Sequence, residues 1–254
     1  FLNREVAENR AALTVLVQNE AGTTGKLTPN PTEKLIARFP NKLDLASKDP
    51  DPEQKPYNLN EYDVILAFDP DWTEVTQQQA DDLKVWVERQ GGGLVLVADR
   101  INTYQLARVE PNSRLSPVLD VLPVLPDDVI AVKIKAIPKT PRRLYLHPLP
   151  GSDLLKIDDP AVVEEKKDGK EPENDPVAGW ERFFTDRKTY AENKDFKVEF
   201  FPRRGFFSCY PVKDVKPGAH VLAEFADLDD RGEKVLRPYI VVSNPAAGFR
   251  TAYM

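Results

Sequence analysis

The chain has 254 residues, of which 35 are Lys or Arg and 41 are Asp or Glu, so its formal net charge is −6. An acidic balance gives no general electrostatic reason to bind nucleic acid or an anionic membrane. The single cysteine, Cys209, excludes an intramolecular disulfide and a cysteine-rich zinc site, and the two histidines disfavour a histidine-based metal centre. No apolar run approaches the roughly 20 residues of a membrane helix. We therefore expect no metal, no cofactor, no nucleic-acid partner and no direct insertion into a membrane.

The first sixty residues alternate short ordered patterns with loop-like stretches. Residues 1–10 read as a helix, and the β-rich apolar run at residues 13–17 predicts a buried strand. Residues 21–31 are rich in Gly, Thr, Pro and Asn, which is typical of a loop. We expect a short helix over residues 31–39 and an exposed loop over the Pro-rich residues 49–56.

The middle of the chain carries the clearest pattern. Residues 62–68 predict a buried strand, and residues 94–98 predict the next one. Between them, Thr76 is placed to cap a helix with Gln79 as its capping-box partner, and Gly91-Gly92-Gly93 ends that helix. Strand, helix and strand at this spacing predict a βαβ unit with two parallel strands.

The second half of the chain is dominated by strand patterns. One or two helical turns are expected at residues 115–122 and a short amphipathic helix at residues 179–185. The predicted strands lie within residues 129–146, on both sides of a turn at 203–205 within 196–211, and at 221–226, 238–242 and 249–253. We expect a single domain over residues 1–254, with a parallel α/β core at 1–126 and a β-rich extension at 127–254.

Several segments in the same order resemble one family. They are Tyr62-Asp63-Val64-Ile65-Leu66, residues 77–86, the Gly91–Ala98 stretch, residues 115–126, Arg143 to Leu149, Lys216 to Ala223 and Arg237 to Phe249. Together they resemble the class I glutamine amidotransferase-like domains of bacterial membrane-anchored proteins, which often accompany von Willebrand A regions. The resemblance spans almost the whole chain.

The resemblance implies both a fold and the kind of protein that contains this domain. It implies a three-layer α/β domain with a flavodoxin-like, glutamine amidotransferase-like parallel sheet and a β-rich, partly antiparallel second half. It also implies that a first parallel strand precedes Phe1 and that the family continues past Met254. We therefore expect a fragment of a larger, membrane-anchored bacterial protein.

A working amidotransferase of this class needs a cysteine on a sharp turn between strand and helix, with a His and a Glu two residues apart later in the chain. The corresponding turn reads Ala98-Asp99-Arg100-Ile101, without Cys or Ser. Cys209 lies far downstream among aromatic residues, which is typical of a packed strand residue. His147 precedes a proline and a leucine rather than a carboxylate, and His220 lies in an apolar strand pattern. We predict no catalytic residue.

Acidic residues follow both predicted parallel strands of the core. Asp69 and Asp71 follow the first strand, and Asp99 and Arg100 follow the second. Because the carboxyl ends of parallel strands meet at one edge of a sheet, these side chains form a candidate ligand-binding site, and the carboxylates could hold a divalent cation. The alternative is that they cap loops, with Asp99 paired to Arg100.

A second candidate surface lies in the aromatic-rich segment. Arg203 and Arg204 stand between Phe201 and the pair Phe206 and Phe207. Exposed Arg and aromatic side chains are typical anchors of protein partners, whereas buried ones belong to the core.

The predicted function follows from the resemblance together with the missing nucleophile. We expect a non-catalytic interaction or scaffolding domain of a membrane-associated bacterial protein, whose partners are other proteins and the rest of its parent chain. Two alternatives stay open: a hydrolase or amidotransferase that uses Cys209 or the acidic edge, and a module that binds a small molecule or carbohydrate there.

Overall fold

A computed structural model describes residues 12–18, 33–44, 53–128, 141–147, 155, 180, 205–228, 232–243 and 250–254. The described residues fall into two compact units. Unit 1 comprises Phe1–Leu122 with Pro245–Thr251, and unit 2 comprises Pro123–Asn244 with Ala252–Met254. The prediction of a single domain stays a prediction, and each unit is described separately below.

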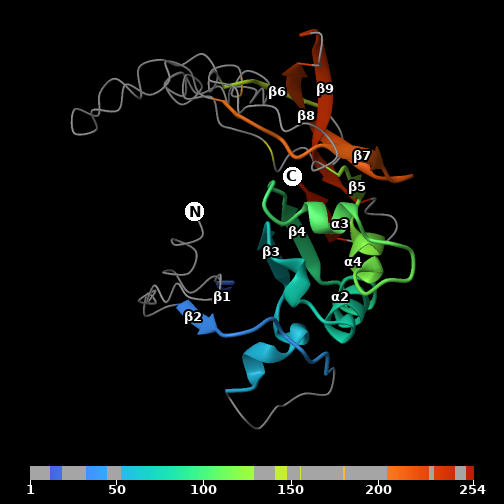
Figure 1. Cartoon of the computed structure of the whole chain (residues 1–254). Helices are drawn as coiled ribbons and strands as arrows, with labels where there is room; N and C mark the ends of the chain where they lie inside the picture. The colour runs from blue at the N-terminus through green and yellow to red at the C-terminus, as the bar shows by residue number, and fades with distance from the viewer. Residues whose placement is uncertain are drawn as a thin grey trace, which may run out of the picture. The chain divides into compact units, whose positions relative to one another are not determined.

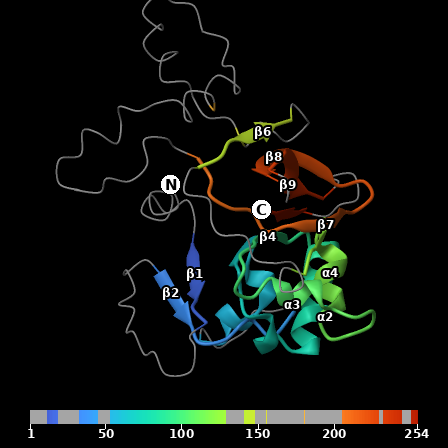
Figure 2. The same cartoon turned by 45° about the horizontal axis from the view of Figure 1, so that its top comes forward.

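Unit 1 contains two pairs of parallel strands. Strand β1 (Leu13–Leu16) pairs with β2 (Glu33–Ile36), and β3 (Val64–Phe68) pairs with β4 (Gly93–Val97) in the register Val64 to Gly93. Figure 2 shows β1 and β2 side by side as a separate blue pair. The helix predicted over residues 31–39 is wrong, because residues 33–36 pair with β1 and tertiary pairing overrides a weak local helix preference.

Helix α2 (Gln77–Arg89) connects β3 to β4 and begins as the sequence predicts. Thr76 caps the helix, and Gln79 completes a reciprocal capping box. After the last turn, Gly91 adopts a positive φ of 73°, which favours glycine because it has no Cβ. Gly92 lies against the Trp86 ring, so close that an added Cβ would stand 2.1 Å from a ring atom. The βαβ prediction, with parallel β3 and β4, is confirmed.

Two further helices complete unit 1 among its described residues: α3 (Tyr104–Ala107) and α4 (Ser116–Val121). Helices α2, α3 and α4 gather on one side of the β3–β4 pair (Figures 1 and 2). The core includes buried apolar side chains from α2, β4 and α4, among them Leu83, Trp86, Val87, Leu94, Leu96, Val118 and Val121. Three 3₁₀ helices lie at Lys55–Tyr57, Leu59–Glu61 and Trp72–Glu74.

Strand β3 is not buried, contrary to the sequence prediction. Its alternate side chains Val64, Leu66 and Phe68 are 53%, 41% and 70% exposed. The strand order in unit 1 is β3-β4-β10, so β3 is the outer strand. An apolar run of five residues cannot by itself reveal whether the strand has one neighbour or two, or whether both faces are covered.

Unit 2 is built from antiparallel strands. Strand β5 (Val124–Pro126) pairs with β7 (Val212–Val215), and the larger sheet has the order β6-β8-β9-β10. Its strands are β6 (Leu144–Leu146), β8 (His220–Leu228), β9 (Lys234–Val242) and β10 (Arg250–Tyr253), of which Arg250 and Thr251 belong to unit 1. Strand β7 was not predicted, whereas the strands expected at residues 221–226, 238–242 and 249–253 are present.

The described residues therefore have mixed α/β content, with parallel pairs in unit 1 and antiparallel pairs in unit 2. The predicted helix at 1–10, the strands at 129–140 and 196–204, and most of the helix at 179–185 lie outside the described residues. Within the described part of the chain, no helix is long and apolar enough to cross a membrane.

Candidate functional site

The carboxyl end of β3 brings Asp69 to the loop that follows β4. Asp69 adopts a positive φ of 39°, which turns its carboxylate toward residues 101–103. One oxygen accepts the amides of Ile101 and Asn102 at 3.1 and 3.0 Å. The other accepts the amide and the hydroxyl of Thr103 at 2.7 and 2.6 Å. The carboxylate thus holds the loop after β4 and has four donors already in place.

Both the backbone and the side chain of Asp71 make hydrogen bonds to neighbouring residues. The Gln18 amide accepts the Asp71 N–H at 2.7 Å and donates to the Asp71 carbonyl at 3.1 Å. The Asp71 carboxylate accepts bonds from the hydroxyl and amide of Thr73 and from Gln105 Nε2. The pKa of the Asp71 carboxyl is lowered, mainly by the hydrogen bond from the Thr73 hydroxyl. Burial acts in the opposite direction and raises this pKa, whereas the Thr73 amide, Gln105 and the charge of Arg114 lower it further.

Asp99 and Arg100 complete the predicted ligand site. Asp99 is exposed, and one of its carboxylate oxygens accepts the Arg100 amide at 2.7 Å. The Asp99 amide in turn donates to the Thr103 hydroxyl at 3.2 Å. The three aspartates therefore share one edge, as predicted, but the contacts shown are to loop amides, hydroxyls and carboxamides. No group of three or more His, Cys, Asp or Glu in the described ranges is placed to hold a metal ion.

The amidotransferase-type residues of unit 2 do not converge. His147 Nε2 lies 2.9 Å from Glu224 Oε2, which supplies the carboxylate that the sequence neighbours of His147 lack. Cys209 instead packs against the buried Leu144–Phe225 cluster. Leu144 pairs with Phe225 and Tyr145 pairs with Glu224, and adjacent strand residues point to opposite faces. His147 and Cys209 therefore lie on opposite faces of the β6–β8 pair.

The predicted Arg and aromatic surface is described only in part. Arg203 and Arg204 lie outside the described residues. Phe206 packs against the Leu144–Phe225 cluster, with ring centroids 6.2 Å from Trp180 and 5.4 Å from Tyr239. Phe207 is half-buried. The described position of Phe206 supports the interpretation of this aromatic as core.

One charged group borders this aromatic core. Asp227 accepts bonds from Arg142 and Arg237, the latter at 2.7 Å, and Arg142 lies over the Phe225 ring. Burial raises the pKa of Asp227, but the amide of Leu228 and the two arginines outweigh burial, so the net pKa is lowered. We interpret this group as a structural ion network, because both arginine side chains bind the one Asp227 carboxylate.

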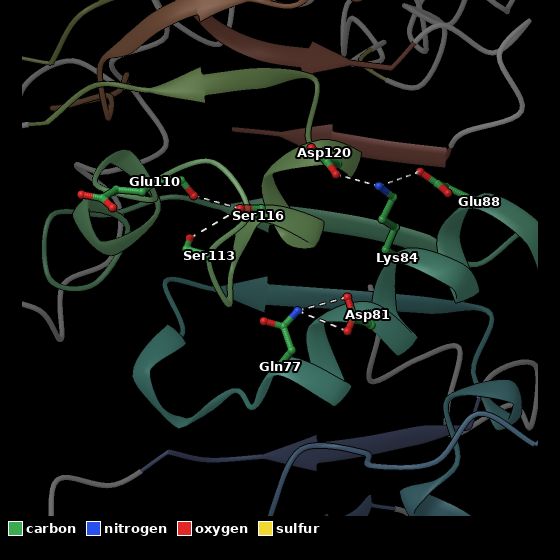
Figure 3. Close-up of polar contacts among 8 residues, drawn as sticks. All are labelled: Gln77, Asp81, Lys84, Glu88, Glu110, Ser113, Ser116 and Asp120. Atoms are coloured by element: carbon green, nitrogen blue, oxygen red, sulfur yellow. Dashed lines mark hydrogen bonds and ion pairs between the residues drawn. The ribbon is translucent and has the colours of Figure 1, made fainter.

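A polar cluster joins α2 to α4 on the surface of unit 1 (Figure 3). The Lys84 ammonium lies between Asp120, at 2.6 Å, and Glu88, at 3.9 Å, so that it bridges the two helices. Its hydrogen bond to Asp120 is the main cause of a raised Lys84 pKa. Lys84 and Glu88 are four residues apart on α2, and Lys84 and Asp120 carry opposite charges, so ordinary ion pairing explains both contacts. We interpret the cluster as a surface salt-bridge network that connects the two helices.

The structure adds a surface that the sequence analysis missed. Cross-strand pairing places Leu236 opposite Ala226 and Lys234 opposite Leu228, on the face that also carries Tyr145. Tyr145, Leu228 and Leu236 are 38%, 42% and 42% exposed, and we call these three residues the outer apolar patch. Lys234 hydrogen-bonds the Tyr145 hydroxyl beside it, and the His147–Glu224 pair lies on the same face. The alternation Leu-Tyr-Leu at residues 144–146 was the only sequence pattern that pointed to this surface. It indicates a strand with two different faces but does not show which face is buried.

Comparison with protein-family models and with curated proteins provides no relative for this chain. No protein-family model matches it, and no curated protein matches it. The resemblance to amidotransferase-like domains therefore stays a prediction.

Proposed function

We propose that this chain is a non-catalytic interaction or scaffolding domain of a membrane-associated bacterial protein, with a three-layer amidotransferase-like fold that lacks the nucleophile. The observation that carries the proposal is the outer apolar patch. Contiguous apolar side chains that remain exposed on a folded surface are typical of protein-binding sites. Here a tyrosine, one of the residue types enriched in protein interfaces, shares an exposed face with two leucines.

The environment of the patch supports a protein partner. Charged and polar groups border the patch, namely Lys234 and the His147–Glu224 pair. An apolar centre with a polar rim is the usual composition of a specific protein interface. The contacts of Asp69 and Asp71 to loop donors also support a structural role for the carboxyl edge.

The proposal can be tested by photo-cross-linking in native membranes. We would introduce p-benzoylphenylalanine in place of Leu236 in the patch and, as a matched control, in place of Lys213, an exposed residue of β7. We expect one reproducible protein adduct from position 236 and none of the same mass from position 213. Identical adducts from both positions, or none from either, would contradict the proposal.

One observation favours an enzymatic alternative. The 2.9 Å contact between His147 and Glu224 has the geometry of a general base held by a carboxylate. In that case the chain would release ammonia from glutamine, or hydrolyse an ester, with a rate that falls at least about a hundredfold in His147→Ala. If neither His147→Ala nor Cys209→Ala changed the rate, the measured activity would come from a contaminating enzyme and the alternative would be wrong.

A further inference from the structure

The outer face of the antiparallel sheet in unit 2 has an apolar centre between two opposite charges. Strands β6, β8 and β9 lie side by side in this sheet (Figure 2). The cross-strand pair Leu144 and Phe225 is buried on the inner face. Because adjacent strand residues point to opposite faces, the next pair, Tyr145 and Glu224, lies on the outer face. The outer apolar patch therefore lies on the side of the sheet opposite the buried cluster.

Strand pairing divides this outer face into three successive rows of side chains. In order along β8, the rows consist of Tyr145, Glu224 and Pro238, then of Ala226 and Leu236, and last of Leu228 and Lys234. Consecutive rows are two residues apart along the strand, which is roughly 7 Å. The first row thus carries an acidic side chain, the last row carries a basic one, and the middle row is apolar.

Both end charges are able to bind a further group of opposite charge. The exposed Lys234 donates to the Tyr145 hydroxyl, and its ammonium lies 4.1 Å from the centroid of the tyrosine ring. Within the described ranges, Lys234 forms no ion pair with a carboxylate. Glu224 contacts His147 through one oxygen, at 2.9 Å, whereas an ionised carboxylate accepts about four hydrogen bonds.

We propose that this outer face binds the same face of a second copy of the chain, about a two-fold axis that crosses the strands at the middle row. The inference rests on the proposed function and names the partner of that surface. Rotation about this axis reverses the order of the rows, so the middle row meets itself and the first row meets the third. Each Lys234 then faces the row that holds Glu224 of the second copy.

Two-fold symmetry explains the arrangement of charges on this face. An interface of this symmetry uses one surface twice, so the surface must be complementary to itself. Leu236 in the middle row packs on its own copy, and the opposite charges on its two sides each meet their opposite. Sheets pack face to face in this way, about 10 Å apart and with nearly aligned strands. A partner of different sequence would require no such match between the two ends.

Charge reversal tests the proposal. Sedimentation velocity of the full chain at roughly 1 to 100 µM should show a reversible equilibrium between monomer and dimer. Lys234→Glu and Glu224→Lys should each weaken dimerisation by at least about tenfold, because each places like charges across the interface. Lys213→Glu, the same change at an exposed residue of β7, is the matched control and should leave the dimer unchanged.

A mixture of the two weakened variants should restore the dimer. When Lys234→Glu pairs with Glu224→Lys, the two introduced charges meet at one end and the two native charges meet at the other. Opposite charges therefore face each other at both ends, and we expect an affinity close to that of the wild type. A mixed dimer also shows that both variants fold, so misfolding would not explain the loss in either variant alone.

Three results would overturn the proposal. A wild-type chain that stays monomeric at roughly 100 µM would exclude a second copy as the partner. A dimer that neither charge reversal weakens would have its interface elsewhere on the chain. A mixture of the two variants that remains monomeric would exclude the two-fold pairing of the rows.

The photo-cross-link at position 236 separates this inference from the proposed function. An adduct with twice the mass of the parent protein supports both. An adduct with a different protein, from a chain that is monomeric in solution, overturns the second copy but supports the interaction surface. No adduct from either labelled position contradicts the proposed function and this inference together.

Discussion

Asp69 holds Thr103 through two hydrogen bonds to one carboxylate oxygen, from the amide at 2.7 Å and from the hydroxyl at 2.6 Å. The two residues belong to loops that follow neighbouring parallel strands, β3 and β4. The bonds therefore tie the two loops of the carboxyl edge together. In many α/β proteins this edge binds a ligand, but here its most central carboxylate stabilises the protein's own backbone.

Asp69→Asn should destabilise the protein by about 1–3 kcal/mol, because an amide nitrogen replaces one acceptor oxygen and faces backbone donors. Asn also tolerates a positive φ, so the substitution isolates the loss of the acceptor from backbone strain. Urea unfolding measures the difference. Asp99→Asn is the control, with an expected effect within about 0.5 kcal/mol because Asp99 is exposed. Equal losses in the two variants would contradict the role assigned to Asp69.

Gln79→Glu should destabilise the protein by about 1–3 kcal/mol at neutral pH. Either residue type completes a capping box, but Gln79 Nε2 also donates to the carbonyls of Phe39 and Pro40 at 3.0 and 3.3 Å. A carboxylate would face those carbonyls without a donor. The loss should shrink below pH ~4.3, where a protonated Glu regains a donor.

Chemical unfolding at pH 3 and pH 7 checks the Gln79 prediction. Thr76→Ser serves as its control, since serine keeps the capping hydroxyl and should change stability little. A loss in Gln79→Glu that does not depend on pH would exclude the proposed contact with the carbonyls.

Gly92→Ala should cost about 1–3 kcal/mol, because its Cβ would overlap the buried Trp86 ring and displace it from the core. Gly91→Asn is the matched control. An added Cβ there meets nothing within 4 Å, and asparagine accommodates the positive φ of 73°. Thermal unfolding followed by tryptophan fluorescence should show a lower midpoint and a shifted emission maximum for Gly92→Ala only. A midpoint lowered more by Gly91→Asn would refute the packing argument.

The lowered pKa of Asp227 predicts that the folded protein loses stability in acid. Its pKa is lowered in the folded protein by the Leu228 amide and by Arg237 and Arg142, against the effect of burial. A lowered folded pKa contributes stability that is present above the unfolded value of ~3.9 and is lost as pH falls through the folded pKa. Asp227→Asn should therefore flatten the acid side of the stability profile.

The acid-stability prediction is measured by urea midpoints between pH 2 and pH 7. Asp214→Asn, which removes the same charge from an exposed position of β7, should leave the profile close to that of the wild type. A parallel change in both variants would mean that net charge, rather than the Arg142–Asp227–Arg237 network, sets the profile.

Local sequence alone determined the elements whose causes lie within a few residues. The capping box at Thr76 and Gln79, the glycines that end α2 and the parallel pairing of β3 with β4 were all predictable from short-range rules. So was the common edge of Asp69, Asp71 and Asp99, because the carboxyl ends of parallel strands meet. The strand at residues 33–36 was mistaken for a helix, since its cause is pairing with β1.

Tertiary structure decided what those elements do. Only the fold showed that the Asp69 carboxylate is occupied by loop donors, that His147 meets Glu224 across strands, and that Cys209 lies on the opposite face. Only the strand order made β3 an outer strand of its sheet. Periodicity specifies which side chains share a face, but which face is covered depends on contacts between residues far apart in the chain.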